Sequence, residues 1–125
     1  MSATKNINAA KIKNIVREKT FTLEAPTASD DITIFRTDVD ITVQEAIVVQ
    51  TGNTPSTTFV LKWASDRSAA GTDLTTSSTT TSTTTGDVAT LSTAAIPANS
   101  WIWLETTAAS GTNVKLSIDI RYTID

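Results

Sequence analysis

The stretch WIWLETTAASGTNVKLSIDIRYTID, residues 101–125, decides how the rest of the chain must fold. From residue 114 onward, apolar and polar side chains alternate without interruption, which is typical of a strand with one buried and one exposed face. The apolar set is Val114, Leu116, Ile118, Ile120, Tyr122 and Ile124. Residues 101–106 are apolar on both faces, and residues 108–113 contain Gly and Asn, which favour tight turns. We therefore expect a β-hairpin here, with its long second strand closing a sheet.

The remaining sequence from residue 21 also has strand patterns, at residues 21–24, 32–34, 39–49, 59–64 and 88–96. Glu45 interrupts the inward parity of residues 39–49, which predicts a β-bulge near residues 44–46. Residues 75–85 are all Ser or Thr, and we expect an exposed strand and turn there. About eight short strands separated by turns predict an all-β, antiparallel, eight-stranded jelly-roll sandwich, with an immunoglobulin-like sandwich as the alternative.

Residues 1–20 lack a strand pattern and form an expected N-terminal arm, extended or partly helical, before a β domain at residues 21–125. The arm carries five basic side chains and one acidic one, a charge of +4, while residues 21–125 carry −7. Such asymmetry suggests that the arm contacts a partner, although a solvated terminus is the simpler alternative. The partner-binding candidates of the arm are Lys5, Lys11, Ile12, Lys13, Ile15, Val16, Arg17 and Lys19.

Composition excludes several classes of function. The chain has no cysteine and no histidine, so it cannot use a Ser–His–Asp or Cys–His catalytic set. Neither a signal peptide nor an apolar run long enough to span a membrane is visible. The body is acidic and the arm lacks interleaved aromatic residues, so we expect neither nucleic acid nor a membrane as partner. We expect no cofactor and no enzymatic activity.

Two groups of residues leave alternatives open. Asp30–Asp31 and the pair Asp38 and Asp40 could bind calcium or serve glycoside hydrolysis, but carboxylates that cap turns explain them more simply. Trp63, Trp101 and Trp103 could form a platform for sugar rings. Because Trp101 and Trp103 share one parity and Ile102 and Leu104 the other, one pair must leave the core. We favour an oligomer contact for Trp101 and Trp103 over a glycan site.

The string IPANSWIWLETTAASGTNVKLSIDIRYT at residues 96–123 resembles the closing strands of small jelly-roll structural proteins of tailed bacteriophages. The segments IFRT at 34–37, ITV at 41–43 and SAAGT at 68–72 are similar to the same group. The resemblance implies a capsid decoration (cement) protein, usually trimeric, or a domain of a tail or neck fibre. It carries over no catalytic residues.

These observations together predict a structural virion protein. We expect a homotrimer that binds the major capsid protein through its arms, clamps the phage head, and lies on the capsid surface after synthesis in the host cytoplasm. An arm at one end, a final strand at the other and the lack of a coiled-coil or collagen-like stalk favour a free-standing decoration protein. The alternatives are a tail or neck fibre that binds a receptor, and a carbohydrate-binding module that binds a host glycan.

Overall fold

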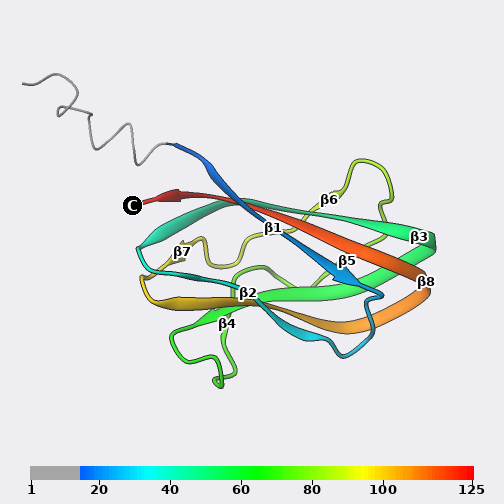
Figure 1. Ribbon diagram of the computed structural model, residues 1–125, viewed down its shortest axis with the longest axis horizontal. Coiled ribbons are helices and arrows are strands. Elements are labelled where there is room, and N and C mark those ends of the chain that lie inside the picture. Colours follow the sequence, from blue (N-terminus) through cyan, green and yellow to red (C-terminus); the bar gives the residue numbers. More distant parts are fainter. Residues whose placement is uncertain (1–14) are drawn as a thin grey trace, which may run out of the picture.

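The computed structural model describes residues 15–125, which form eight β-strands and no helix. Two of the strands are very long, and the other six are short segments that flank them (Figure 1). The strands are β1 (Arg17–Glu24), β2 (Asp31–Thr37), β3 (Ile41–Ala64), β4 (Thr72–Asp73), β5 (Ser78–Thr80), β6 (Asp87–Val88), β7 (Ala95–Ile96) and β8 (Ser100–Ile124).

β3 and β8 form an antiparallel ribbon that runs the length of the molecule and folds over on itself. The first half of β3 pairs with the second half of β8, from Ile41 opposite Ile124 to Thr51 opposite Lys115. The second half of β3 pairs with the first half of β8, up to Ala64 opposite Trp101. Both strands bend together at one end of the molecule (Figure 1). One ribbon therefore supplies the middle of both layers of a sandwich.

The short strands complete the two layers. In the first layer, β1 lies beside the second half of β8, while β6 and β7 lie beside the first half of β3. In the second layer, β2 lies beside the first half of β8, while β4 and β5 lie beside the second half of β3. Every pairing is antiparallel. The expected antiparallel eight-stranded sandwich is thus confirmed, and its folded ribbon is the arrangement of a jelly roll.

The expected hairpin within residues 101–125 is wrong, because these residues form one continuous strand. Residues 108–113 do not reverse the chain but bend it, opposite residues 52–58 of β3. Gly111 has a φ of 74°, and a Cβ atom there would lie 2.0 Å from the Thr54 carbonyl oxygen. The side-chain oxygen of Asn113 accepts hydrogen bonds from Gln50 (2.6 Å) and from the Ser56 amide (3.1 Å). Gly and Asn therefore mark a corner that two strands share.

The core lies between the layers and contains Leu116, Ile118 and Ile120, as the alternation predicts, whereas Val114 of the same apolar set is 48% exposed, against the prediction. The β-bulge is confirmed by a register shift between Val43 and Glu45. It reverses the parity of the strand, so Ala46, Val48 and Gln50 are buried. The expectation that Ile47 and Val49 point inward is wrong, since both lie on the other side of β3 from these buried residues.

Two segments differ from their predicted character. β1 begins at Arg17, so residues 17–20, which the sequence placed in the arm, pair with residues 119–122 of β8. The run at residues 75–85 is not uniformly exposed, because Thr75 and Thr80 are fully buried. The Leu61 amide donates to the Thr75 hydroxyl (3.1 Å), which gives that side chain a structural role. A partly helical arm at residues 1–14 lies outside the described residues.

Candidate functional site

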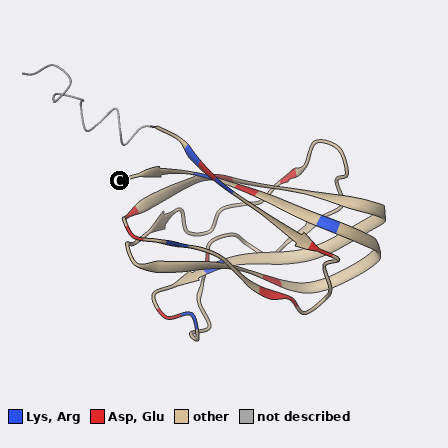
Figure 2. Cartoon of the chain, viewed as in Figure 1, with Lys and Arg blue, Asp and Glu red and all other residues tan. Residues whose placement is uncertain are grey.

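The start of β1 carries the described part of the predicted arm. Ile15 and Val16 directly precede this strand and are 52% and 53% exposed. Arg17 and Lys19 belong to β1 itself, and Figure 2 shows basic positions at its start. The Lys19 ammonium lies 5.9 Å from the centre of the Phe35 ring, which stacks on Tyr122 at the open edge of the sandwich. The other arm candidates, Lys5, Lys11, Ile12 and Lys13, lie outside the described residues.

Several chain segments meet at the end of the sandwich from which β1 starts, which we call the arm end. Strand pairing brings the start of β3 and the end of β8 together there, with β7 beside them (Figure 1). Val39, in the turn between β2 and β3, is 44% exposed. A shallow depression beside it is lined by Asp40, Ala95, Ile96, Pro97 and Asp125. The arm end thus combines exposed apolar side chains with carboxylates.

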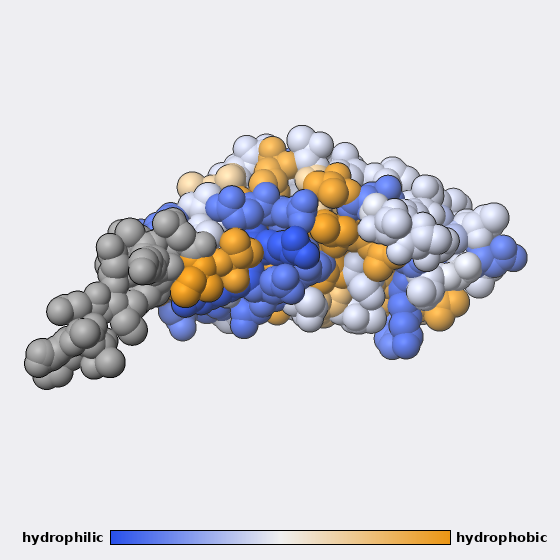
Figure 3. Space-filling view, turned by 90° about the horizontal axis from the view of Figure 1, so that it is seen from above, coloured by the Kyte–Doolittle hydropathy of each residue, from blue (hydrophilic) through white to orange (hydrophobic). Residues whose placement is uncertain are grey.

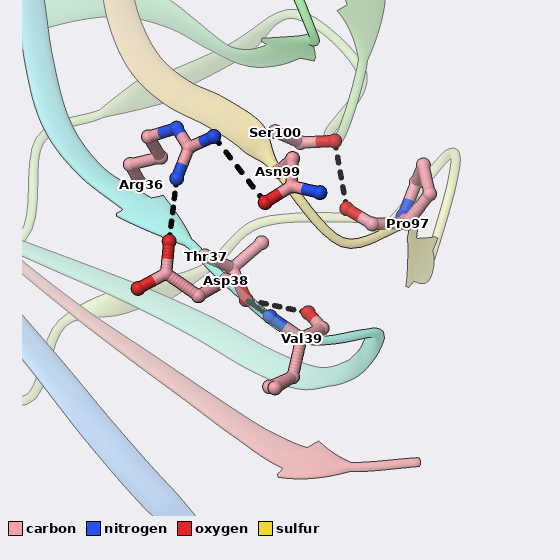
Figure 4. A network of polar contacts seen from close by, with 7 residues as sticks. All are labelled: Arg36, Thr37, Asp38, Val39, Pro97, Asn99 and Ser100. Atoms are coloured by element: carbon pink, nitrogen blue, oxygen red, sulfur yellow. Dashed lines mark hydrogen bonds and ion pairs between the residues drawn. The ribbon is translucent and has the colours of Figure 1, made fainter.

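A polar network fixes the two turns of the arm end (Figure 4). The Thr37 hydroxyl donates to the Val39 carbonyl oxygen (2.6 Å), and the Asn99 amide donates to the Thr37 carbonyl oxygen (2.7 Å). Arg36 forms an ion pair with Asp38 and donates to the Asn99 side chain (3.3 Å). These contacts tie the turn after β2 to the turn before β8. Thr37 therefore holds the backbone of Val39 in a turn that is itself tied to the turn before β8.

Trp101 extends the arm end onto the outer face of the second layer. The Arg36 guanidinium lies 5.7 Å from the centre of its ring, within the range of a cation–π contact. The side chain is only half-buried, and it lies opposite both Arg36 of β2 and Ala64 of β3. The structure thus brings one of the two predicted tryptophans to the same end of the molecule as Ile15 and Val16.

Trp103 does not provide the accessible surface that the sequence suggested. Trp101 and Trp103 do leave the core, which Ile102 and Leu104 fill, but Trp103 is fully buried. The loop between β3 and β4 covers it, with the Arg67 guanidinium 4.3 Å from the ring centre. A Cβ atom on Gly71 would lie 2.5 Å from the indole, so only glycine fits there. The indole nitrogen donates to Glu105 (2.7 Å), which completes its hydrogen bonding.

The outer face of the first layer is a second surface, which sequence reasoning missed. We define it by four side chains of charged residues, Glu18, Glu45, Asp119 and Arg121, and by three apolar ones, Ile47, Val49 and Val88. Residues that lie opposite each other on neighbouring strands share a face, and such pairs join Glu18 and Glu45 to Arg121, and Ile47 to Asp119 and Val88. Seen from above, this side of the molecule shows apolar side chains beside hydrophilic ones (Figure 3). The shift of parity after the bulge, which residue alternation alone does not reveal, creates its apolar part.

The acidic clusters bind protein donors. The Thr27 amide donates to Asp30 (2.6 Å) and the Ala98 amide to Asp40 (2.7 Å), while Asp31 pairs with Arg67. The first two contacts are the turn-capping role that the simpler interpretation predicted, and the third is an ion pair. Within residues 15–125, no group of three or more His, Cys, Asp or Glu side chains could hold a metal ion.

Hydrogen bonds lower the pKa of two carboxyl groups, Asp66 and Asp87. The Ser68 hydroxyl and then the Ser68 amide lower the pKa of Asp66. The Thr80 hydroxyl, at 2.8 Å, is the largest cause that lowers the pKa of Asp87; burial opposes it as the next largest effect, and the amides of Ser82 and Thr81 lower the pKa further. Asp66 thus stabilises its own turn, and Asp87 ties β6 to the end of β5 and the residues after it. No helix of the described part is long and apolar enough to cross a membrane.

Comparison with known proteins supports the fold. No protein-family model matches the chain, and no curated protein sequence matches it. Among solved structures, a chain of the cyanophage Pam1 capsid asymmetric unit is similar over 89% of this chain and 84% of its own length, with a TM-score of 0.51 and 14% identity. At this identity the similarity concerns the fold alone.

Two further structures are more distant. A chain in the structure of the infectious bursal disease virus Gt strain is similar over 88% of the present chain, with 14% identity and a TM-score of 0.44. The matched part covers 33% of that viral chain. Bacillus endospore appendages, described as disulfide-linked pili, are 17% identical over 88% of this chain and 89% of that one, with a TM-score of 0.39.

Proposed function

We propose that this chain is a structural protein of a virion, a capsid decoration (cement) protein that binds the major capsid protein of a phage head. The observation that carries the proposal is the sandwich fold, similar over 89% of the chain to a chain of the cyanophage Pam1 capsid asymmetric unit. The residue types support a binding role, because the chain has neither the histidine nor the cysteine that common catalytic sets require.

The arm end is the surface that we assign to the capsid contact. Val39 is an exposed apolar side chain at this end, and the turn network fixes the turn that presents it. The lysines of residues 1–14 add charge that a partner surface can neutralise. As a homotrimer, the protein would present three such ends, and linked weak contacts multiply the overall affinity.

Binding of purified protein to undecorated heads tests this proposal. We expect the full chain to cosediment with heads and a chain lacking residues 1–10 to bind much more weakly, since the truncated chain keeps every described strand but loses Lys5. Val39→Asp should also weaken binding. Val114→Asp is the matched control, because Val114 is 48% exposed at the opposite, bent end of the ribbon. Equal decoration by all four proteins would rule out the arm end as the anchor.

The alternatives lead to different partners. A tail or neck fibre would bind tails or a host receptor instead of heads. A carbohydrate-binding module would need an exposed tryptophan platform, but Trp63 packs against the core and Trp103 is covered. Titration of tryptophan fluorescence with host glycans checks this second alternative directly, and we expect no saturable change.

A further inference from the structure

The outer face of the first layer carries uncompensated negative charge. Arg121 is shared by three carboxylates: its Nε lies 3.3 Å from Glu18 and 3.5 Å from Asp119, and a terminal guanidinium nitrogen lies 3.5 Å from Glu45. One cation for three anions leaves a local charge of −2. A basic side chain from outside would therefore find a favourable potential.

Apolar side chains lie directly beside these carboxylates. Asp119 is opposite Ile47, which is opposite Val88 of β6, and Val49 is two positions further along β3. Val88 is 63% exposed, the highest exposure among the large apolar side chains of the described part. The face therefore has an acidic part next to an apolar part. A peptide segment with basic residues followed by apolar residues would complement both parts.

The chain contains a segment of this kind in KIKNIV, residues 11–16. Lys11 and Lys13 match the local charge of −2, and the exposed Ile15 and Val16 match the apolar patch. The same copy cannot supply both halves of the contact. Val16 directly precedes β1, whereas Val88 lies on β6, three strand spacings away across β8 and β3, or about 14 Å at about 4.8 Å per strand.

We propose that residues 11–16 of one copy bind the outer face of the first layer of a second copy. The two contacting surfaces differ, so the contact is head-to-tail, and such contacts close into rings when the rotation allows it. Any closed ring satisfies every segment and every face, and the proposed homotrimer is such a ring of three. This inference rests on the self-association within the proposed function but not on binding to heads, and it leaves residues 1–10, with Lys5, for the capsid.

Light scattering and sedimentation of the full chain at micromolar concentration test the inference. We expect a particle of three times the 13.3 kDa chain mass. Val88→Lys places a cation in the apolar patch, and Lys11→Glu with Lys13→Glu reverses the charge of the segment. Each variant should raise the dissociation constant about tenfold or more. Val114→Lys, at another exposed valine (48%) at the far end, should leave the dissociation constant unchanged, as should removal of residues 1–10.

Thermal melting and circular dichroism confirm that each variant is folded before it is compared. A monomeric full chain, or a Val88→Lys protein as trimeric as the original, would overturn the inference. Loss of head binding by Val88→Lys with an intact trimer would also overturn it, because the face would then bind the capsid protein. Failure of head binding by a normal trimer, in contrast, counts against the proposed function alone.

Discussion

Arg67 is the residue that decides whether the loop between β3 and β4 stays on the sheet. Its guanidinium covers the Trp103 ring, pairs with Asp31 and donates to the Thr33 hydroxyl (2.9 Å). Arg67→Ala should expose part of the indole and lower the free energy of unfolding by about 1–2 kcal/mol, since cation–π and partly buried polar contacts are each worth about 0.5–2 kcal/mol. Lys115→Ala, which removes only an exposed pair with Glu24, is the control and should change it little. Chemical denaturation measures both, and equal stability of the two variants would contradict this role.

The hydrogen bond from the Thr80 hydroxyl to the Asp87 carboxylate predicts that the free energy of unfolding depends on pH. Its pKa is lowered mainly by the Thr80 hydroxyl, so its ionised form favours the folded state. That contribution is present above the unfolded value of about 3.9 and is lost as pH falls through the lower folded pKa. Asp87→Asn should therefore lose less stability than the original chain between about pH 5 and pH 3. Thr80→Val, which keeps the shape but removes the donor, should behave in the same way. Equal falls in melting temperature between pH 5 and pH 3 for all three proteins would contradict this role of Asp87.

At the scale of elements, the ribbon of β3 and β8 depends on the corner that both strands share. Gly111→Ala would place a methyl group against the Thr54 carbonyl oxygen while holding a positive φ. A left-handed backbone at a residue other than glycine costs about 1–2 kcal/mol before any clash is counted. We expect a fall in melting temperature of several degrees or more. Ser110→Ala, at the neighbouring exposed position, should melt close to the original, and a similar melting point for Gly111→Ala would show that the corner is tolerant.

The same elements show what the sequence can predict. Alternation in residues 114–125 identifies a strand and its buried face, and Glu45 identifies the bulge, because both signals are local. The fate of Gly111 and Asn113 is not local, since these residues suit either a hairpin turn or a bend. The choice depends on residues 101–106 finding β2 and the second half of β3 as partners. The change of parity after the bulge is also not local, because only the register with β8 shows which side chains then face the core.

The candidate site was predictable only in part for a related reason. The sequence indicates apolar residues outside the core at three positions. Ile15 and Val16 lie in a segment without a strand pattern, and Trp101 has the opposite parity to the core residues Ile102 and Leu104. The burial of Trp103 depends on a loop that reaches it from another strand, and the network of Val39 and Arg36 joins turns far apart in the chain. Tertiary contacts, and not the pattern of any one strand, create the arm end and the outer face of the first layer.

The whole molecule is a sandwich with two surfaces that we assign to contacts, the arm end and the outer face of the first layer, and we propose that it belongs to the head of a virion. The protein composition of purified virions, quantified relative to the major capsid protein before and after removal of tails, tests this claim most directly. The account predicts that the chain is present in a fixed ratio and remains with the heads. Its absence from purified virions, or its loss together with the tails, would contradict the claim.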